Sequence, residues 1–143
     1  SALCLAETLP DGGHVHTIEV DDEMEDELTE LFATSPGGER ITLHIGDALK
    51  VIPTLNETWD LIYIDANKRD YIAYLDLLLP TLRPGTFIIA DNTLWDGKVY
   101  DTVKNHDAQT LGLDAFNTYV AAHPRLASVI LPLRDGLTLI RVD

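Results

Sequence analysis

The sequence predicts an α/β fold with a doubly wound, mostly parallel sheet, and three observations support this. Short apolar or β-branched runs recur along the chain, at residues 14–20, 40–46, 59–65, 85–91, 126–132 and 137–142. Patterns of helical period separate most of these runs. The segments LIYI and FIIA are apolar without interruption, as in strands that are covered on both faces. Strands that alternate with helices predict βαβ units and therefore parallel pairing.

Helices are predicted where apolar residues recur at helical spacing. The opening SALCLAETLP already reads as an amphipathic helix, and others are predicted over residues 24–34, 48–55, 70–82 and 108–123. Only Arg-Asp-Gly at 134–136 separates the last two apolar runs. A short gap that contains Asp-Gly predicts an antiparallel hairpin, and hence one antiparallel strand near the end of the sheet.

Size, composition and charge narrow the classes of function. A chain of 143 residues that is 45% hydrophobic can bury one sizeable core, so a single domain over residues 1–143 is predicted. The net charge of −14 repels a phosphate backbone and an anionic membrane surface, so we expect neither nucleic acid nor membrane as partner. The single cysteine, Cys4, is predicted to be a buried thiol and cannot form an internal disulfide, which favours a cytoplasmic location.

Two predicted strands end in the same way, at an aspartate. These are Asp65 and Asp91, and Asn92 follows the second. In an open α/β sheet, ligands bind beyond the carboxyl ends of the strands, and consecutive strands usually lie side by side. Two neighbouring carboxylates require a shared proton or a cation, and the added amide oxygen suits a hard ion such as Mg²⁺. The alternative is that each aspartate only caps a turn, but the duplication favours a site.

Lys68 follows Asp65 by three positions and lies near the start of the next predicted helix. A cation gains nothing from the helix dipole there. Close to a bound cation, a lysine could act as general base towards a hydroxyl group held by that cation. The alternative, which spacing alone favours, is an exposed surface lysine beside Arg69.

Other strand ends offer weaker candidates. Glu19 closes the first strand, where an acidic residue commonly accepts hydrogen bonds from ribose hydroxyls, but it could equally belong to the acidic run that follows. Asp47 could be only the N-cap of the next helix. Trp95 follows the second aspartate on a loop and could be a hydrophobic plug or the wall of a substrate pocket.

Several stretches together resemble the cation-dependent S-adenosylmethionine O-methyltransferases, which include catechol and caffeoyl-CoA O-methyltransferases. The bacterial small-molecule members of this family are the most similar in sequence. The stretches are GDAL (46–49), LIYIDANKRDY (61–71), LRPGTFIIADNTLWDGKV (82–99), DAQTLG (107–112) and ILPLRDGLTLIR (130–141). The resemblance covers nearly the whole chain, and the ordered pair IDANK and ADNTLW is its most specific part. It implies a Rossmann-like fold and transfer of a methyl group from S-adenosylmethionine.

The resemblance also implies a metal centre and a base. In it, Asp65, Asp91 and Asn92 bind Mg²⁺ or a similar divalent cation, and Lys68 is the catalytic base. The cation would hold two adjacent phenolic oxygens of a catechol-like acceptor, and the deprotonated oxygen would attack the sulfonium methyl group in line. The loop from 95 to 112 is expected to help select the acceptor.

For the cofactor S-adenosylmethionine, the resemblance implies a second set of residues. Glu19 holds the ribose, and Asp47 and Ala48 lie beside the adenine. Trp95 helps to wall the catechol or cofactor pocket, and Asp65 also lies at the cofactor.

The front of the chain departs from the family pattern. A first strand that ends in a glycine-rich turn, of the form E-I-G-x-x-x-G-Y, would immediately precede Ser1 and is missing, together with an N-terminal helical region. We therefore expect a fragment of a longer enzyme whose neighbouring strands have unpaired edges. Such a fragment would bind S-adenosylmethionine poorly alone, while exposed edges favour association, with a homodimer as the expected state.

Two other classes of function compete with this interpretation. The missing glycine-rich turn suggests a non-catalytic interaction domain that keeps the fold. A receiver-type signalling domain also uses strand-end carboxylates, Mg²⁺ and a lysine, but the predicted antiparallel hairpin is foreign to it, so it ranks last.

Overall fold

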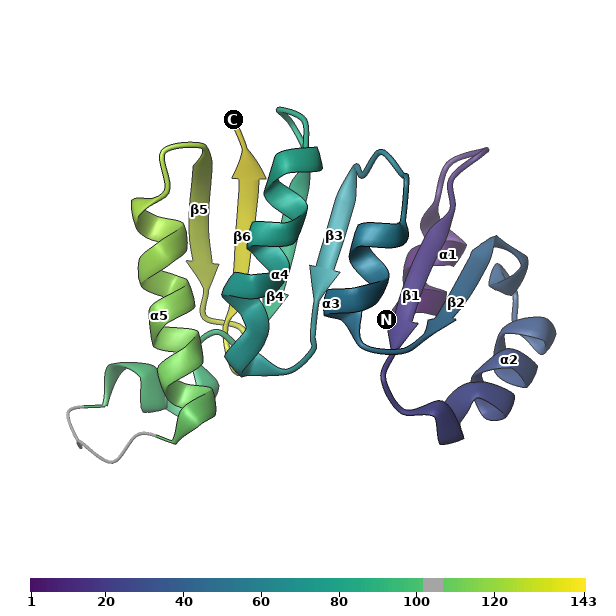
Figure 1. Cartoon of the computed structure of the whole chain (residues 1–143), viewed down its shortest axis with the longest axis horizontal. Coiled ribbons are helices and arrows are strands. Elements are labelled where there is room, and N and C mark those ends of the chain that lie inside the picture. Colours follow the sequence, from purple (N-terminus) through teal and green to yellow (C-terminus); the bar gives the residue numbers. More distant parts are fainter. Residues whose placement is uncertain (102–106) are drawn as a thin grey trace. The chain divides into compact units, whose positions relative to one another are not determined.

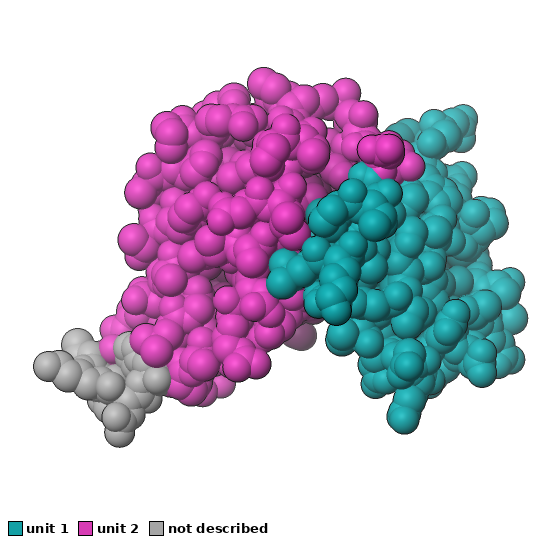
Figure 2. All heavy atoms as spheres, viewed as in Figure 1, with its two compact units in different colours: residues 1–55 teal, residues 56–143 magenta. Residues whose placement is uncertain are grey.

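The computed structural model of the chain describes residues 1–101 and 107–143. Part of the loop expected to select the acceptor, residues 102–106, lies outside the described residues. The chain divides into two compact units, residues 1–55 and 56–143 (Figure 2). In the part that is described, no helix has both the length and the apolar character that crossing a membrane requires.

The first unit is a two-stranded parallel sheet with helices. In chain order its elements are α1 (Ala2–Thr8), β1 (Val15–Glu19), α2 (Glu25–Thr34), β2 (Ile41–Ile45) and α3 (Ala48–Val51), with 3₁₀ turns η1 (Asp22–Met24), η2 (Gly38–Arg40) and η3 (Ile52–Thr54) (Figure 1). The parallel register pairs Val15 with Ile41 at one end and Glu19 with Ile45 at the other. Cys4 on α1 is exposed, so its predicted burial is wrong: it lies on the solvent face of the helix, whereas Ala6 is buried.

The second unit is a four-stranded sheet in the order β3-β4-β6-β5. In chain order its elements are β3 (Leu61–Ile64), η4 (Lys68–Asp70), α4 (Tyr71–Leu78), η5 (Leu79–Thr81), β4 (Phe87–Asp91), η6 (Trp95–Tyr100), α5 (Ala108–Ala122), β5 (Leu126–Leu131) and β6 (Leu137–Val142). The pair β3–β4 is parallel, and β6 runs antiparallel to both of its neighbours. The antiparallel strand predicted from the sequence is confirmed, and it lies between β4 and β5.

The core of this unit lies between one face of the sheet and the helices α4 and α5 (Figure 1). Alternate residues of β4 and β6 face it, and so do the apolar faces of the helices. The fully buried side chains are Tyr71, Leu75, Ile88, Ala90, Leu113, Phe116, Ile140 and Val142. Burial of large apolar side chains, at about 1.5 to 3 kcal/mol each, is the main source of stability here.

The opposite face of the same sheet carries apolar side chains that remain accessible. Leu61 and Phe87 pair across β3 and β4 and are 40% and 41% exposed, while Val129 of β5 is 52% exposed. Ile89 and Leu139, in register with Val129, are half-buried. The LIYI and FIIA segments are therefore covered on one face more fully than on the other in the described residues.

Each unit also has an unpaired strand edge. Among the described residues, β1 pairs only with β2, and β3 pairs only with β4. β1 and β3 are therefore edge strands in the part of the chain that is described, with backbone groups that no neighbouring strand pairs.

The predicted helix over 70–82 is divided into shorter elements. Pro80 lies in the first turn of η5, and a proline cannot donate the backbone hydrogen bond that α4 would need in order to continue. Asp70 occupies the N-cap position of α4 but makes no side-chain capping bond. Instead, its carboxylate accepts a hydrogen bond from Asn67 Nδ2 at 2.5 Å.

Candidate active site

The ends of β3 and β4 bring the two predicted carboxylates to neighbouring positions. Ile64 pairs with Ala90 in parallel register, so Asp65 and Asp91 follow matched residues on adjacent strands. Neighbouring strands lie about 4.8 Å apart. The prediction that the two strands are adjacent is confirmed.

Asp91 is oriented by two hydrogen bonds. Its Oδ2 accepts one from the hydroxyl of Tyr63 at 2.6 Å, and its Oδ1 accepts one from the backbone N–H of Asn92 at 2.7 Å. Asn92 has a φ of 60°, a left-handed conformation that asparagine tolerates better than most residues. The chain therefore turns sharply at the strand end, immediately after the carboxylate.

Lys68 is buried, with only 8% of its surface exposed. The alternative of an exposed surface lysine is therefore wrong. Its Nζ donates to Asp65 Oδ1 at 2.7 Å and to the hydroxyl of Tyr71 at 2.9 Å. The ammonium group thus lies at the strand-end carboxylate, because η4 returns the chain to the sheet edge before α4 begins.

Tyr63 and Tyr71 lie close enough to both carboxylates to be affected by their charges. Burial raises the pKa of Tyr63 well above its usual range, and the hydrogen bond to Asp91 and the charges of Asp91 and Asp65 raise it further. Burial is also the main cause that raises the pKa of Tyr71, followed by the charges of the same two carboxylates. Both hydroxyls therefore keep their protons, and both aspartates act on each of them.

The segment after β4 is held by the hairpin turn between β5 and β6. The backbone N–H of Leu94 donates to the carbonyl of Asp135 at 2.7 Å, and that of Thr93 donates to the carbonyl of Gly136 at 3.1 Å. A Cβ on Gly136 would lie 2.4 Å from Cγ of Leu94, so only glycine allows this approach. The amide of Asn117 on α5 also donates to the carbonyl of Thr93, at 2.8 Å.

Trp95 lies half-buried in this segment with a φ of 47°. Its indole N–H is buried and has no hydrogen-bond partner among the described residues. Lys98 Nζ lies 5.8 Å from the centre of the ring, within range of a cation–π contact. This geometry fits both a hydrophobic plug and a pocket wall, so the role of Trp95 stays a prediction.

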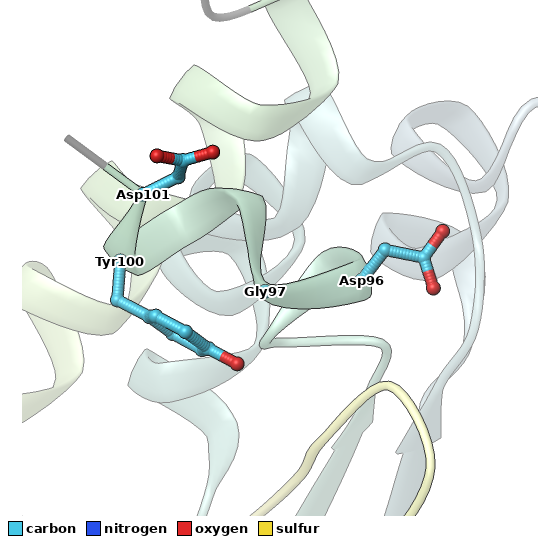
Figure 3. A pocket seen from close by; sticks show the side chains of 4 residues that line it. All are labelled: Asp96, Gly97, Tyr100 and Asp101. Carbon is cyan, nitrogen blue, oxygen red and sulfur yellow. The ribbon is translucent and has the colours of Figure 1, made fainter. Parts of the chain in front are cut away.

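A shallow hollow of about 410 Å³ opens beside η6 (Figure 3). It is lined by Asp96, Gly97, Tyr100 and Asp101, of which all but the glycine are exposed. None of the strand-end side chains lines it. The hollow is therefore a feature of the loop and is separate from the carboxylate and lysine cluster.

In the first unit, the predicted cofactor residues are engaged locally. Glu19 ends β1, and its Oε1 accepts a hydrogen bond from the backbone N–H of Asp21 at 2.9 Å. Asp47 caps α3, because its carboxylate accepts from the N–H of Leu49 at 3.0 Å. Ala48 is the first residue of that helix. The N-cap role of Asp47 is thus confirmed, and the cofactor roles of all three residues stay predictions.

The donor set at the ends of β3 and β4 fits a hard divalent cation. Asp65 and Asp91 supply carboxylate oxygens and Asn92 supplies an amide oxygen, with no sulfur or imidazole ligand in the set. Such a cation commonly takes one or two carboxylates and leaves its other positions to water and substrate. The described residues contain no group of three or more His, Cys, Asp or Glu side chains arranged to hold a metal. An open site with two carboxylates and one amide is consistent with that.

Sequence reasoning predicted the hairpin turn at 134–136 but not its contact with the segment after β4, and it missed Tyr63, Tyr71 and Gly112. Tyr71 had a signal, because it lies three residues after Lys68 at a helix start, where residues three apart share a face. Tyr63 alternates with Asp65 along an apolar strand and could be assigned to the same side. Gly112 of α5 lies so close to η4 that a Cβ there would be 2.8 Å from the carbonyl oxygen of Lys68. This approach and the hairpin contact join distant parts of the chain, so the local sequence pattern does not indicate them.

These observations define a doubly wound α/β protein with an oxygen-rich cluster and a buried lysine at the carboxyl ends of its strands. The chain belongs to the O-methyltransferase family, whose profile matches residues 1–142.

Curated relatives agree with this family. The chain is 31% identical over 148 residues to a catechol O-methyltransferase of Niastella koreensis, covering 97% of this chain and 66% of that protein. It is 30% identical over 155 residues to the caffeoyl-CoA O-methyltransferase of Petroselinum crispum, covering 99% of this chain and 63% of that protein. The chain thus spans less than two thirds of the length of these relatives.

Solved structures show the same fold. The O-methyltransferase from Bacillus cereus, in complex with SAH, superposes with a TM-score of 0.91 at 30% identity and covers 99% of this chain and 68% of that one. The O-methyltransferase TomG from Streptomyces achromogenes, in complex with SAM, has a TM-score of 0.89 at 28% identity, with 98% and 66% covered. The predicted Rossmann-like fold and family are therefore confirmed.

Proposed function

We propose that the protein transfers a methyl group from S-adenosylmethionine to a hydroxyl group of a catechol-like small molecule, with the help of a divalent cation, most simply Mg²⁺. The observation that carries this proposal is the buried Lys68, whose ammonium lies 2.7 Å from Asp65 at the paired strand ends. A lysine at this position would be within reach of a hydroxyl group held by a cation at the strand ends, as a general base must be. Family membership supplies the reaction class.

Each residue of the cluster has a distinct task in this proposal. Asp65, Asp91 and Asn92 would hold the cation. Lys68, as the neutral amine that repulsion from the bound cation favours, would receive the proton of the acceptor hydroxyl. When bound, the cation supplies charge that stabilises the oxyanion, and S-adenosylmethionine supplies the methyl group. The acceptor oxygen would form a bond to the methyl carbon as the bond from carbon to sulfur breaks, and S-adenosylhomocysteine would leave. The chain contributes alignment and a place for the proton.

The cofactor residues are part of the same proposal. The carboxylate of Glu19 would accept hydrogen bonds from the ribose hydroxyls in addition to the one from the N–H of Asp21. Asp47 and Ala48 would lie beside the adenine, Asp65 would also contact the cofactor, and Trp95 would help to form the pocket wall. The binding of SAM to TomG and of SAH to the Bacillus cereus enzyme supports this cofactor.

We further propose that residues 1–143 act as one methyltransferase domain within a longer enzyme, in the cytoplasm and as a homodimer. Nucleic acid is not expected as a partner at a net charge of −14. The unpaired edges of β1 and β3 support the expectation that this chain alone binds S-adenosylmethionine weakly. Tight cofactor binding by the 143-residue chain in calorimetry would contradict that expectation.

The test is methyl transfer from labelled S-adenosylmethionine to a simple catechol by the longer enzyme that contains residues 1–143, with Mg²⁺ and with a chelator. We expect transfer only with the cation and loss of transfer in Asp91→Ala, whereas Asp114→Ala, at an exposed position of α5, should behave like the unchanged protein. Transfer that persists with a chelator would remove the proposed metal role. Absence of transfer despite cofactor binding would favour the non-catalytic interaction domain.

A further inference from the structure

We propose that Tyr71 is the positioning residue for Lys68, and that its hydroxyl fixes the lysine amine at the ends of both strands. This inference rests on the proposed function in one respect, the assignment of Lys68 as the proton acceptor. The contacts that support the position of the amine are hydrogen bonds among the described residues and do not depend on that function.

The hydroxyl of Tyr71 connects three parts of the site. It accepts a hydrogen bond from Lys68 Nζ at 2.9 Å, and it lies 3.2 Å from the carbonyl oxygen of Ile64 and 3.0 Å from that of Asp91. A phenol has one proton to donate and lone pairs to accept with. The proton therefore points to the carbonyls and a lone pair to the lysine, so that the last residues of β3 and β4 jointly set the position of the amine.

Tyr71 is well suited to hold this position because it cannot move freely. It is fully buried, with 0% of its surface exposed, and its ring packs edge-on against Phe116 at 5.3 Å between ring centres and 84° between planes. The carbonyls of Ile64 and Asp91 both lie within reach of its hydroxyl proton. A fixed ring whose proton is held by these carbonyls leaves few orientations for the lone pair that Lys68 uses.

The backbone of Lys68 is fixed from the other side by α5. A Cβ on Gly112 would lie 2.8 Å from the carbonyl oxygen of Lys68 and 2.8 Å from Cα of Arg69, so α5 approaches η4 as closely as a glycine allows. A long, flexible side chain is thereby held at its backbone by α5 and at its tip by Tyr71. Lysine otherwise has many rotamers, and a group that must meet a substrate proton benefits from having few.

Without the Tyr71 hydroxyl, the amine of Lys68 would keep its hydrogen bond to Asp65 among the described residues. Lys68 would then be drawn towards a carboxylate that the proposed site needs for a cation. The position of the amine would change while the cation ligands themselves stayed in place. The expected defect is therefore in methyl transfer and not in cation binding.

The test uses Tyr71→Phe, which keeps the ring against Phe116 and removes only the hydroxyl, with Tyr119→Phe as the matched control. Tyr119 also has a hydrogen-bonded hydroxyl, which donates to Asp76 at 2.6 Å on the exposed side of the helices. We expect Tyr71→Phe to lower kcat about 10- to 100-fold, as is common when a supporting hydrogen bond at a site is removed. The Kd for Mn²⁺, used as a probe cation, should change less than about twofold, and Tyr119→Phe should change neither quantity.

A double-mutant cycle separates positioning from a general structural role. If Tyr71 acts through Lys68, then Tyr71→Phe should have no further effect on kcat in a Lys68→Met background. Losses that multiply in the double variant would overturn the inference. So would a lower affinity for Mn²⁺ that accounts for the whole loss of transfer.

A second readout does not depend on activity. Buried, hydrogen-bonded lysine ammonium groups exchange protons with water slowly, so their ¹H–¹⁵N signals become visible. We expect such a signal from Lys68, identified by its absence in Lys68→Met, and its loss in Tyr71→Phe but not in Tyr119→Phe. If Tyr71→Phe does not fold, the unchanged protein still provides a test. The inference is contradicted if the ammonium protons of Lys68 exchange with water as fast as those of Lys50, whose side chain is 84% exposed. A protected Lys68 signal in a protein that shows no methyl transfer would leave the inference standing and reject the proposed function.

Discussion

The hydroxyl of Tyr63 lies 2.6 Å from Oδ2 of Asp91, and this hydrogen bond joins β3 to β4 at the edge where both strands end. Burial and the neighbouring carboxylates raise the pKa of Tyr63, so it remains a donor throughout the neutral range. The orientation of one proposed cation ligand therefore depends on a phenol two residues before the other ligand, Asp65.

The first prediction follows from this contact. Tyr63→Phe should weaken Mn²⁺ binding by about 10-fold or more, because carboxylate ligands depend on the hydrogen bonds that orient them. Isothermal titration with Mn²⁺ measures the effect, and Tyr119→Phe again serves as the control. An unchanged Kd in Tyr63→Phe would show that the hydrogen bond from Asn92 N–H is sufficient to orient Asp91.

The second prediction concerns Lys68→Met, which keeps the length of the side chain and removes its amine. Methyl transfer should fall by about 10²- to 10⁴-fold, the range that general acid–base groups commonly contribute. Affinity for Mn²⁺ should not fall, because Asp65 loses a competing partner. Lys50→Met, at an exposed position, is the control. Retention of full activity in Lys68→Met would sink the base assignment.

The third prediction tests the close approach of α5 to η4. Gly112→Ala would place a Cβ against backbone atoms of Lys68 and Arg69, which cannot rotate away. Overpacking costs about 1 to 3 kcal/mol, and alanine returns up to about 1 kcal/mol through its helix propensity. We expect a net loss of up to about 2 kcal/mol in the free energy of unfolding, measured in urea, together with weaker methyl transfer. A variant more stable than the unchanged protein would contradict the packing described here.

The fourth prediction concerns pH. Asp107 caps α5 by accepting from the N–H and the hydroxyl of Thr110, and the backbone hydrogen bond is the main cause that lowers the pKa of its carboxyl from 3.8. A lowered folded-state pKa means that this stabilisation is complete above about pH 4 and is lost as the carboxylate is protonated in stronger acid. Asp107→Ala should therefore lower the melting temperature at pH 7, and the difference should shrink as the pH falls below 3.8.

A matched variant isolates the charge of Asp107 from its capping geometry. Asp107→Asn keeps an oxygen acceptor and cannot titrate. Its melting temperature relative to Asp107→Ala should be independent of pH through the acid range. A difference between Asp107→Ala and the unchanged protein that is constant from pH 7 to strong acid would show that the charge has no role.

The sequence was sufficient for the elements and for the strand-end carboxylates. Alternation of apolar runs predicted the strands within one or two residues, and the hairpin between β5 and β6 predicted the antiparallel strand. Asp65 and Asp91 could be predicted as neighbours because parallel strands end at a common edge. The helix predicted over residues 70–82 is divided in the structure. Its apolar face continues past Pro80, but the proline ends α4.

The burial of Lys68 could not be predicted, because it depends on partners brought in by tertiary structure. Spacing alone favoured a solvent-exposed lysine, whereas the ammonium donates to the hydroxyl of Tyr71 and α5 approaches the backbone of Lys68 at Gly112. Cys4 was misassigned for a related reason: a helix of seven residues has few apolar positions with which to fix its buried face. Local patterns indicate elements, but they do not indicate which side chains another element will cover.

The accessible apolar face of the four-stranded sheet, with Leu61, Phe87 and Val129, has a practical consequence when it is combined with a net charge of −14. At low ionic strength, mutual repulsion opposes non-specific aggregation of the chain. Added salt shortens the range of that repulsion to about 10 Å at 0.1 M and leaves apolar attraction unopposed. The chain should therefore be easiest to concentrate in dilute buffer and should precipitate on addition of sulfate, so the ionic strength chosen for purification will decide how much protein remains in solution.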